Sequence, residues 1–179
     1  MDRAATAAES RQLVEIFLDA CVRGQLRLSR QQASQIRYDE VPYSIRWNFR
    51  RDDPGRFYRI REPLDATLAI LSYDPPTKDG WAERCLLFSN HIKRPVAWNI
   101  IAASVPGGVE EKSRDDLLHY VLDVPQLRYR ITAGSGDYRY GIVVKLQTIL
   151  YDEATAARLF DRQYRRLKSL RKHGMVKSK

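Results

Sequence analysis

Three histidines are the side chains of this chain best suited to acid–base chemistry: His91, His119 and His173. His91 lies in a polar stretch two residues before Lys93. Two histidines beside a lysine can cleave RNA by general acid–base catalysis. A small metal-independent ribonuclease that uses His91 is therefore one hypothesis. The spacing does not show that His91 and His119 meet, and His119 falls beside the apolar stripe of a predicted helix, where structural histidines are more common.

Other catalytic and metal-binding signatures are missing from the sequence. It contains no GxxxxGKS/T phosphate loop, no HExxH zinc motif, no CxxC pair and no GxSxG nucleophile motif. The two cysteines, Cys21 and Cys85, have no metal or redox spacing. We expect Cys21 to pack on the apolar face of a helix, and we expect no disulfide framework. These observations favour a protein that is not an enzyme, and they predict no catalytic residue, no cofactor and no metal.

Positive charge is concentrated near the end of the chain. The net charge is +9, yet residues 158–179 carry nine basic side chains and one acidic one, whereas the first 157 residues carry 22 basic and 21 acidic ones. In a helical projection the basic side chains fill one arc, opposite an apolar arc around Phe160. A localised cationic face is typical of a surface that binds phosphate, an anionic membrane or an acidic protein. We predict contacts with nucleic-acid phosphates from Arg158, Arg162, Arg165, Arg166, Lys168 and Lys172.

A second set of arginines alternates with apolar residues in the middle of the chain. Residues 44–50 and 57–61 both show the period of a half-buried strand, and a turn sequence with Pro54 and Gly55 separates them. This pattern predicts a β-hairpin with arginines on one face. Cationic side chains with an aromatic neighbour on a sheet can follow a nucleic-acid backbone and stack a base. The candidate contacts of this hairpin are Arg46, Arg50, Arg59 and Arg61.

The remaining patterns give the elements that must position these side chains. Thr6 and Glu9 form a capping box at the start of an amphipathic helix over residues 7–22. A second box at Ser29 predicts a short helix to about residue 37, and a third at Ser113 predicts a helix to about residue 122. Asp152 is expected to cap a final helix. Further strands are predicted over residues 66–73, 81–88, 96–105, 127–132 and 138–150, with a turn at 133–137, and residues 100–103 would also suit a helix.

These elements predict an α+β fold. We expect a mostly antiparallel sheet of about six or seven strands, with an N-terminal helix, one inserted helix and a basic amphipathic C-terminal helix. A single domain would span residues 1–173, with its sheet region over 43–150 and its basic helix over 153–173. Residues 174–179 would form a flexible basic tail.

The leading hypothesis is a non-enzymatic nucleic-acid-binding protein with a regulatory or accessory role. DNA and RNA suit this chemistry equally. The first alternative is a protein-interaction subunit or inhibitor that docks its basic helix on an acidic partner, and the ribonuclease is the second. The first residues lack an apolar run, and residues 96–105 are too short to cross a bilayer. We therefore expect a cytoplasmic protein with no membrane partner.

Overall fold

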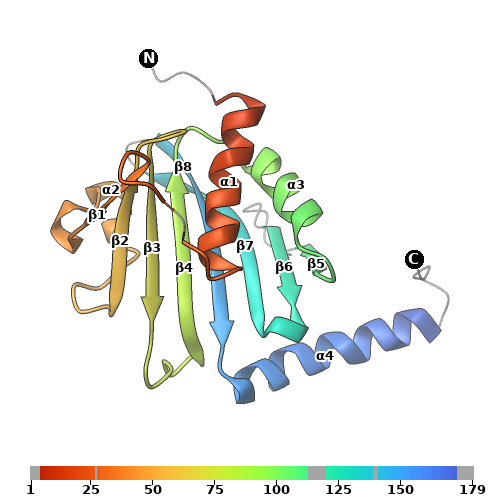
Figure 1. Cartoon of the computed structure of the whole chain (residues 1–179). Helices are drawn as coiled ribbons and strands as arrows, with labels where there is room; N and C mark the ends of the chain where they lie inside the picture. Colours follow the sequence, from red (N-terminus) through yellow and green to blue (C-terminus); the bar gives the residue numbers. More distant parts are fainter. Residues whose placement is uncertain (1–4, 27, 113–119, 139–140, 173–179) are drawn as a thin grey trace.

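The computed structural model describes residues 5–26, 28–112, 120–138 and 141–172 (Figure 1). Over these residues the chain forms four α-helices and eight strands. The helices are α1 (Ala7–Cys21), α2 (Tyr43–Arg46), α3 (Arg94–Ser104) and α4 (Glu153–Lys172). The strands are β1 (Ala33–Ile36), β2 (Gly55–Ile60), β3 (Ala66–Ser72), β4 (Trp81–Ser89), β5 (Val109–Lys112), β6 (Tyr120–Val124), β7 (Tyr129–Tyr138) and β8 (Gly141–Tyr151).

The eight strands of the described residues form one antiparallel sheet in the order β1-β2-β3-β4-β8-β7-β6-β5. Strands β1 to β4 pair in chain order, and the chain then crosses through α3 to β5 at the far edge. It returns through β6 and β7 to β8, which pairs with β4 and joins the two halves. The predicted α+β class, with an antiparallel sheet between an N-terminal and a C-terminal helix, is confirmed.

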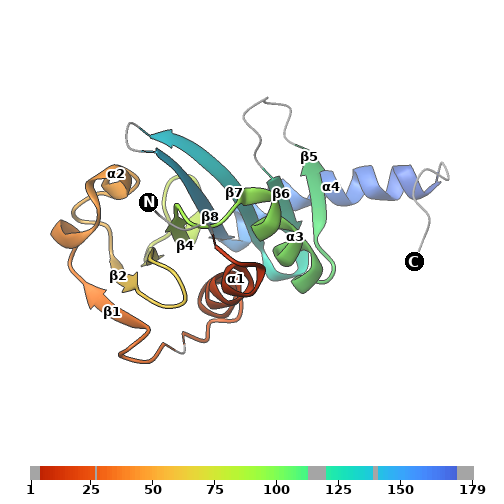
Figure 2. The same cartoon turned by 90° about the horizontal axis from the view of Figure 1, so that it is seen from above.

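The main core lies between the sheet and the pair of helices α1 and α3, which lie side by side on one face (Figures 1 and 2). We call this the first face. Its fully buried side chains come from both helices and from central strands, including Leu13, Phe17, Leu87, Ile101 and Leu146. An amphipathic helix buries its apolar stripe in this way because removing that surface from water is the dominant favourable term in folding.

Helix α1 begins at the predicted capping box and ends at a disulfide. Glu9 N donates to Thr6 Oγ1 at 3.2 Å, and Thr6 N donates to Glu9 Oε2 at 2.8 Å, which satisfies two amide donors at the helix start. At the other end, Cys21 is bonded to Cys85 of β4. The expectation that Cys21 only packs in the core, with no disulfide, is wrong. Sequence spacing could not show the pairing, because 64 residues separate the two positions.

The opposite face of the sheet, the second face, is covered by two separate segments. The chain around α2 packs Val41, Ile45 and Phe49 against β2, β3 and β4. The first turns of α4 pack Ala156 and Phe160 against the end of β8. Beyond these turns α4 extends past the β5 edge of the sheet (Figures 1 and 2).

The predicted hairpin over residues 44–61 is wrong in its first half. Residues 43–46 form α2, and the chain then turns before β2 begins at Gly55. Ile45 and Phe49 are both buried, whereas Trp47 between them is 65% exposed. A spacing of four residues suits a helical turn as well as a strand, so the alternation was ambiguous. Strand β2 pairs instead with β1 and β3.

Two other predictions about local structure, before β1 and after β4, also differ from the structure. The box at Ser29 does form, since Gln32 N donates to Ser29 Oγ at 3.2 Å, but it closes a single turn that leads into β1. The predicted short helix is therefore wrong. The predicted strand over residues 96–105 is wrong, because residues 94–104 form α3 with Pro95 in its first turn; the helical alternative for residues 100–103 is confirmed.

The predicted helix of residues 113–122 is wrong at its end, because residues 120–122 belong to β6; residues 113–119 lie outside the described residues. The predicted turn at 133–137 is part of β7, where small residues such as Gly136 pair with β8. The predicted basic tail, residues 174–179, lies outside the described residues. Among the residues that the structure describes, no helix is both long and apolar enough for a bilayer span.

Candidate functional site

The candidate site lies at the end of the sheet where the β3–β4 turn meets the beginning of α4 (Figure 1). Thr77 closes this turn by accepting from Trp81 N through its Oγ1 at 3.1 Å. Gly80 O accepts from Asp152 N at 2.8 Å and ties the turn to the helix. Asp152 caps α4 as predicted, accepting from Thr155 N at 2.8 Å. That backbone bond from Thr155 lowers the pKa of Asp152 below its usual value, so the carboxylate stays charged at the positive end of the helix.

Gly80 is the position on which this junction depends. Its φ is +75°, and a Cβ there would lie 2.6 Å from Thr155 Cβ and 2.7 Å from Asp152 Oδ2. We expect Gly80→Ala to lower the free energy of unfolding by about 2 kcal/mol or more, because backbone strain adds to the collision. Gly24→Ala is the matched control, since Gly24 has a φ of +65° with nothing within 4 Å of its Cβ position. Urea unfolding of both variants measures the difference, and equal losses would show that the junction is not tight.

A hollow of about 470 Å³ opens between the β3–β4 turn and α4. We call it the α4 hollow. Its apolar wall comes from β4, β8 and α4, and its rim is cationic. The wall includes Trp81, Tyr151 and Leu159, and the rim includes Lys78, Arg158 and Arg162. Two of the predicted phosphate contacts, Arg158 and Arg162, therefore face an aromatic surface of the folded body.

A second hollow of about 650 Å³ adjoins the first and shares Lys78, Asp79 and Trp81 with it. We call it the Arg84 hollow, and we call the two together the groove. The Arg84 guanidinium carbon lies 4.8 Å from the centre of the Trp81 ring. Tyr73 also lines this hollow, and burial raises its pKa although a hydrogen bond with Arg84 opposes the rise. The hydroxyl of Tyr73 thus stays neutral and can donate a hydrogen bond.

The groove is strongly cationic. It is lined by five basic side chains, whereas only Asp53 and Asp79 are acidic: the basic residues are Arg50, Lys78, Arg84, Arg158 and Arg162. Within the part of the chain that the structure describes, none of the five forms an ion pair. Several arginines elsewhere do, for example Arg23 with Glu15 at 3.0 Å. The groove therefore gathers cations that form no ion pair among the described residues, although the charge of Arg158 also acts on the nearby Asp152 carboxylate.

The other predicted residues of the basic helix are placed only in part. Arg165 is exposed on α4 and pairs with Asp161 at 2.6 Å. Arg166, Lys168 and Lys172 belong to α4, but their side chains lie outside the described residues. The predicted cationic face is thus described over its first part, where Arg158 and Arg162 reach the groove.

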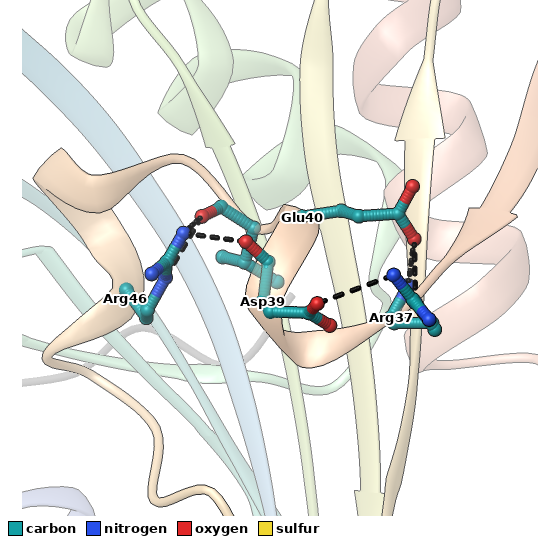
Figure 3. A network of polar contacts seen from close by, with 5 residues as sticks. Arg37, Asp39, Glu40 and Arg46 are labelled. Atoms are coloured by element: carbon teal, nitrogen blue, oxygen red, sulfur yellow. Dashed lines mark hydrogen bonds and ion pairs between the residues drawn. The ribbon is translucent and has the colours of Figure 1, made fainter.

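The four predicted hairpin arginines do not share one face. Arg50 lines the Arg84 hollow. Arg46 donates from Nη2 to the carbonyl oxygens of Asp39 and Val41, each at 2.7 Å, next to the pairs that Arg37 forms with Asp39 and Glu40 (Figure 3). Its donors therefore hold the segment that covers the second face. Two others make contacts away from the groove: Arg59 pairs with Asp65 at 3.2 Å, and Arg61 Nη2 donates to Ser34 Oγ at 3.1 Å.

His91 lies beyond the far end of β4 from Trp81. Eight residue steps of strand separate Trp81 from Ser89, or roughly 25 Å at the usual rise of a strand. His91 N donates to Ser89 Oγ at 3.2 Å. His119 and His173 lie outside the described residues. The groove therefore does not include His91, and its use as a ribonuclease base stays a prediction.

The sequence analysis did not find Lys78, Arg84, Trp81, Tyr73 or Trp47 as site residues. They come from a turn, two strand ends and a loop, so no shared period marks them. The turn sequence around Lys78 was a signal available in the sequence, whereas the exposure of Trp47 is visible only in the structure. What brings them together is the pairing of β4 with β8, in which Trp81 lies opposite Tyr151.

Comparison with known proteins does not extend this description. The chain matches no protein-family model, no curated protein and no solved structure. Over the described residues, no group of three or more histidine, cysteine, aspartate or glutamate side chains is arranged to hold a metal ion.

Proposed function

We propose that this protein is non-enzymatic and binds nucleic acid through the groove and the adjoining cationic face of α4. The observation that carries the proposal is the gathering of five basic side chains, none of them in an ion pair among the described residues, around the aromatic rings of the groove. Like charges held together repel one another, and an anionic partner removes that cost. Arginine suits this partner because its planar fork can donate two hydrogen bonds to one phosphate.

The geometry favours nucleic acid over an acidic protein. An acidic protein surface needs only the exposed cations on α4, which any carboxylate could neutralise. The groove adds ring surfaces from Trp81 and Tyr151 beside Arg158 and Arg162. Aromatic rings next to arginines are a recurrent arrangement for contacting bases and phosphates together.

The test compares two double variants that remove the same charge. Arg158→Gln with Arg162→Gln removes two cations of the groove, whereas Arg11→Gln with Arg30→Gln removes two exposed cations elsewhere. Binding to labelled DNA and RNA is measured by fluorescence anisotropy at several salt concentrations. We expect the first variant to bind more weakly, and the slope of log K against log salt to shrink by up to about 1.4 on single strands or 1.8 on duplexes. The control should keep the parent slope.

Two outcomes would contradict this proposal. If the parent binds neither DNA nor RNA even at low salt, the acidic protein partner becomes the leading alternative. If both double variants lose affinity equally, binding reflects net charge and not the groove. Circular dichroism of the variants controls for folding, and glutamine preserves the helix propensity of α4.

A cytoplasmic location stays a prediction. The Cys21–Cys85 bond weighs against it, because disulfides persist mainly in oxidising compartments. Alkylation of thiols in intact cells, followed by mass spectrometry of the protein, would show whether the bond exists where the protein works.

A further inference from the structure

The groove has the dimensions of a site for single nucleotides. The α4 hollow measures about 470 Å³ and the Arg84 hollow about 650 Å³, and small-molecule sites span roughly 300 to 1,000 Å³. The two hollows adjoin at Trp81, which lines both. A chain of nucleotides could therefore occupy them in succession, with Trp81 between neighbouring units.

Trp81 is held rigidly enough to act as a stacking surface. It packs against the cluster that Tyr151 and Phe160 form at the end of β8, and it is only partly exposed. The Arg84 guanidinium lies over a face of the ring, 4.8 Å from its centre, so a base reaches this site by stacking on the guanidinium plane that covers Trp81. A surface fixed by packing loses little conformational freedom when a base stacks on it, and that preserves binding free energy.

Arg84 has an unused donor at this point. Its Nε atom is buried and has no hydrogen-bond partner within the described residues. Burying such a donor is unfavourable unless an acceptor reaches it. The atom itself is covered, so a ligand in the Arg84 hollow meets the plane of the Arg84 guanidinium, the exposed cation of Arg50 and the hydroxyl of Tyr73.

Trp47 provides a second aromatic surface at the other end of the groove. It lines the Arg84 hollow and is 65% exposed. Large aromatic side chains are usually mostly buried in a folded protein. An exposed tryptophan beside cations is typical of a surface that stacks a base.

We propose that the groove binds a single strand of DNA or RNA, with one base stacked on the Arg84 guanidinium that covers Trp81, another base stacked on Trp47, and phosphates held by Lys78, Arg158 and Arg162. This inference rests on the proposed nucleic-acid-binding function. The bases of a duplex are stacked on one another and present no ring face to a protein side chain. A duplex can therefore touch only the cationic rim, whereas a single strand can enter both hollows.

The experiment combines affinity measurements with a matched pair of aromatic variants. Labelled oligothymidylate, a single-stranded RNA and a duplex of equal length are titrated with the parent, Trp47→Ala and Tyr43→Ala. Tyr43 is 76% exposed at the start of α2, four residues before Trp47, but does not line the groove. We expect single strands to bind more tightly than the duplex, and Trp47→Ala to weaken single-strand binding by about fivefold or more. Tyr43→Ala should leave every affinity unchanged, and duplex binding should not respond to either variant.

Tryptophan fluorescence can follow Trp81 without replacing it, so the packing around its ring stays intact. The chain has three tryptophans, so a variant with Trp47→Phe and Trp98→Phe leaves Trp81 as the only one. We expect oligothymidylate to quench its emission. A duplex that binds as tightly as single strands, with no quenching and no effect of Trp47→Ala, would overturn the single-strand inference and leave nucleic-acid binding in place. Absence of binding to all three probes would overturn the proposed function and this inference with it.

Discussion

Reduction of the Cys21–Cys85 bond is expected to lower the free energy of unfolding by about 4 kcal/mol. The bond closes a loop of 64 residues, and restricting a loop of that length in the unfolded chain gives a stabilisation of this size in the chain-entropy treatment. The bond joins the last residue of α1 to the centre of β4, so it links the helix that covers the first face to the middle of the sheet. Urea unfolding with and without dithiothreitol measures the effect.

The double variant Cys21→Ala with Cys85→Ala is the control for this experiment, because it should be insensitive to reductant. Unfolding curves of the parent that coincide in the two conditions, with mass spectrometry confirming two thiols after reduction, would contradict the prediction. Nucleic-acid affinity should not change while the reduced protein is still folded. The groove lies on the second face, and α1 covers the first.

Sequence patterns predicted the outer helices well because their signals are local. The capping box at Thr6 and the cap at Asp152 are each made by residues three positions apart, and both form as expected. The box at Ser29 forms with equal quality but closes only one turn. A cap satisfies the first amides of a helix without providing the apolar stripe that must follow it, and residues 33–36 pair with β2 instead.

The middle of the chain was harder to predict because short apolar patterns suit two periods. Ile45 and Phe49 are separated by four residues, which places them on one side of a helical turn and also on one side of a strand. Burial against the second face decided between them, and that face does not exist until β2, β3 and β4 have paired. The wrong prediction of an arginine-lined hairpin over residues 44–61 followed from this ambiguity.

The basic helix was visible in the sequence, but the groove was not. Arg158 and Arg162 belong to an amphipathic pattern within one segment, whereas Trp81 and Arg84 come from a strand about 75 residues earlier. They meet because β4 pairs with β8 across the insertion of α3 and β5 to β7. Contacts of such long range depend on topology, which local periodicity does not specify.

Phe160→Ala is expected to cost about 3 kcal/mol and to loosen the docking of α4, the helix that forms one side of the α4 hollow. Phe160 is 3% exposed and meets Tyr151 edge to face, with ring centres 6.0 Å apart. Replacing a buried phenylalanine by alanine loses the burial of the ring and leaves a cavity. Because this contact docks α4 on the sheet, the variant should also lose nucleic-acid affinity although it keeps Arg158 and Arg162.

Leu159→Ala is the matched control for stability, because Leu159 lies next to Phe160 on the same helix but is 36% exposed. Its truncation should cost far less. Thermal unfolding followed by far-ultraviolet circular dichroism, together with tryptophan emission, separates two ways in which Phe160→Ala can act. Early loss of helical signal with an unchanged main transition would show that α4 detaches while the sheet stays folded, and a single lower transition would show that helix and sheet unfold together. A variant that unfolds like the parent would contradict the docking of α4, and with it the position of the two arginines that the groove requires.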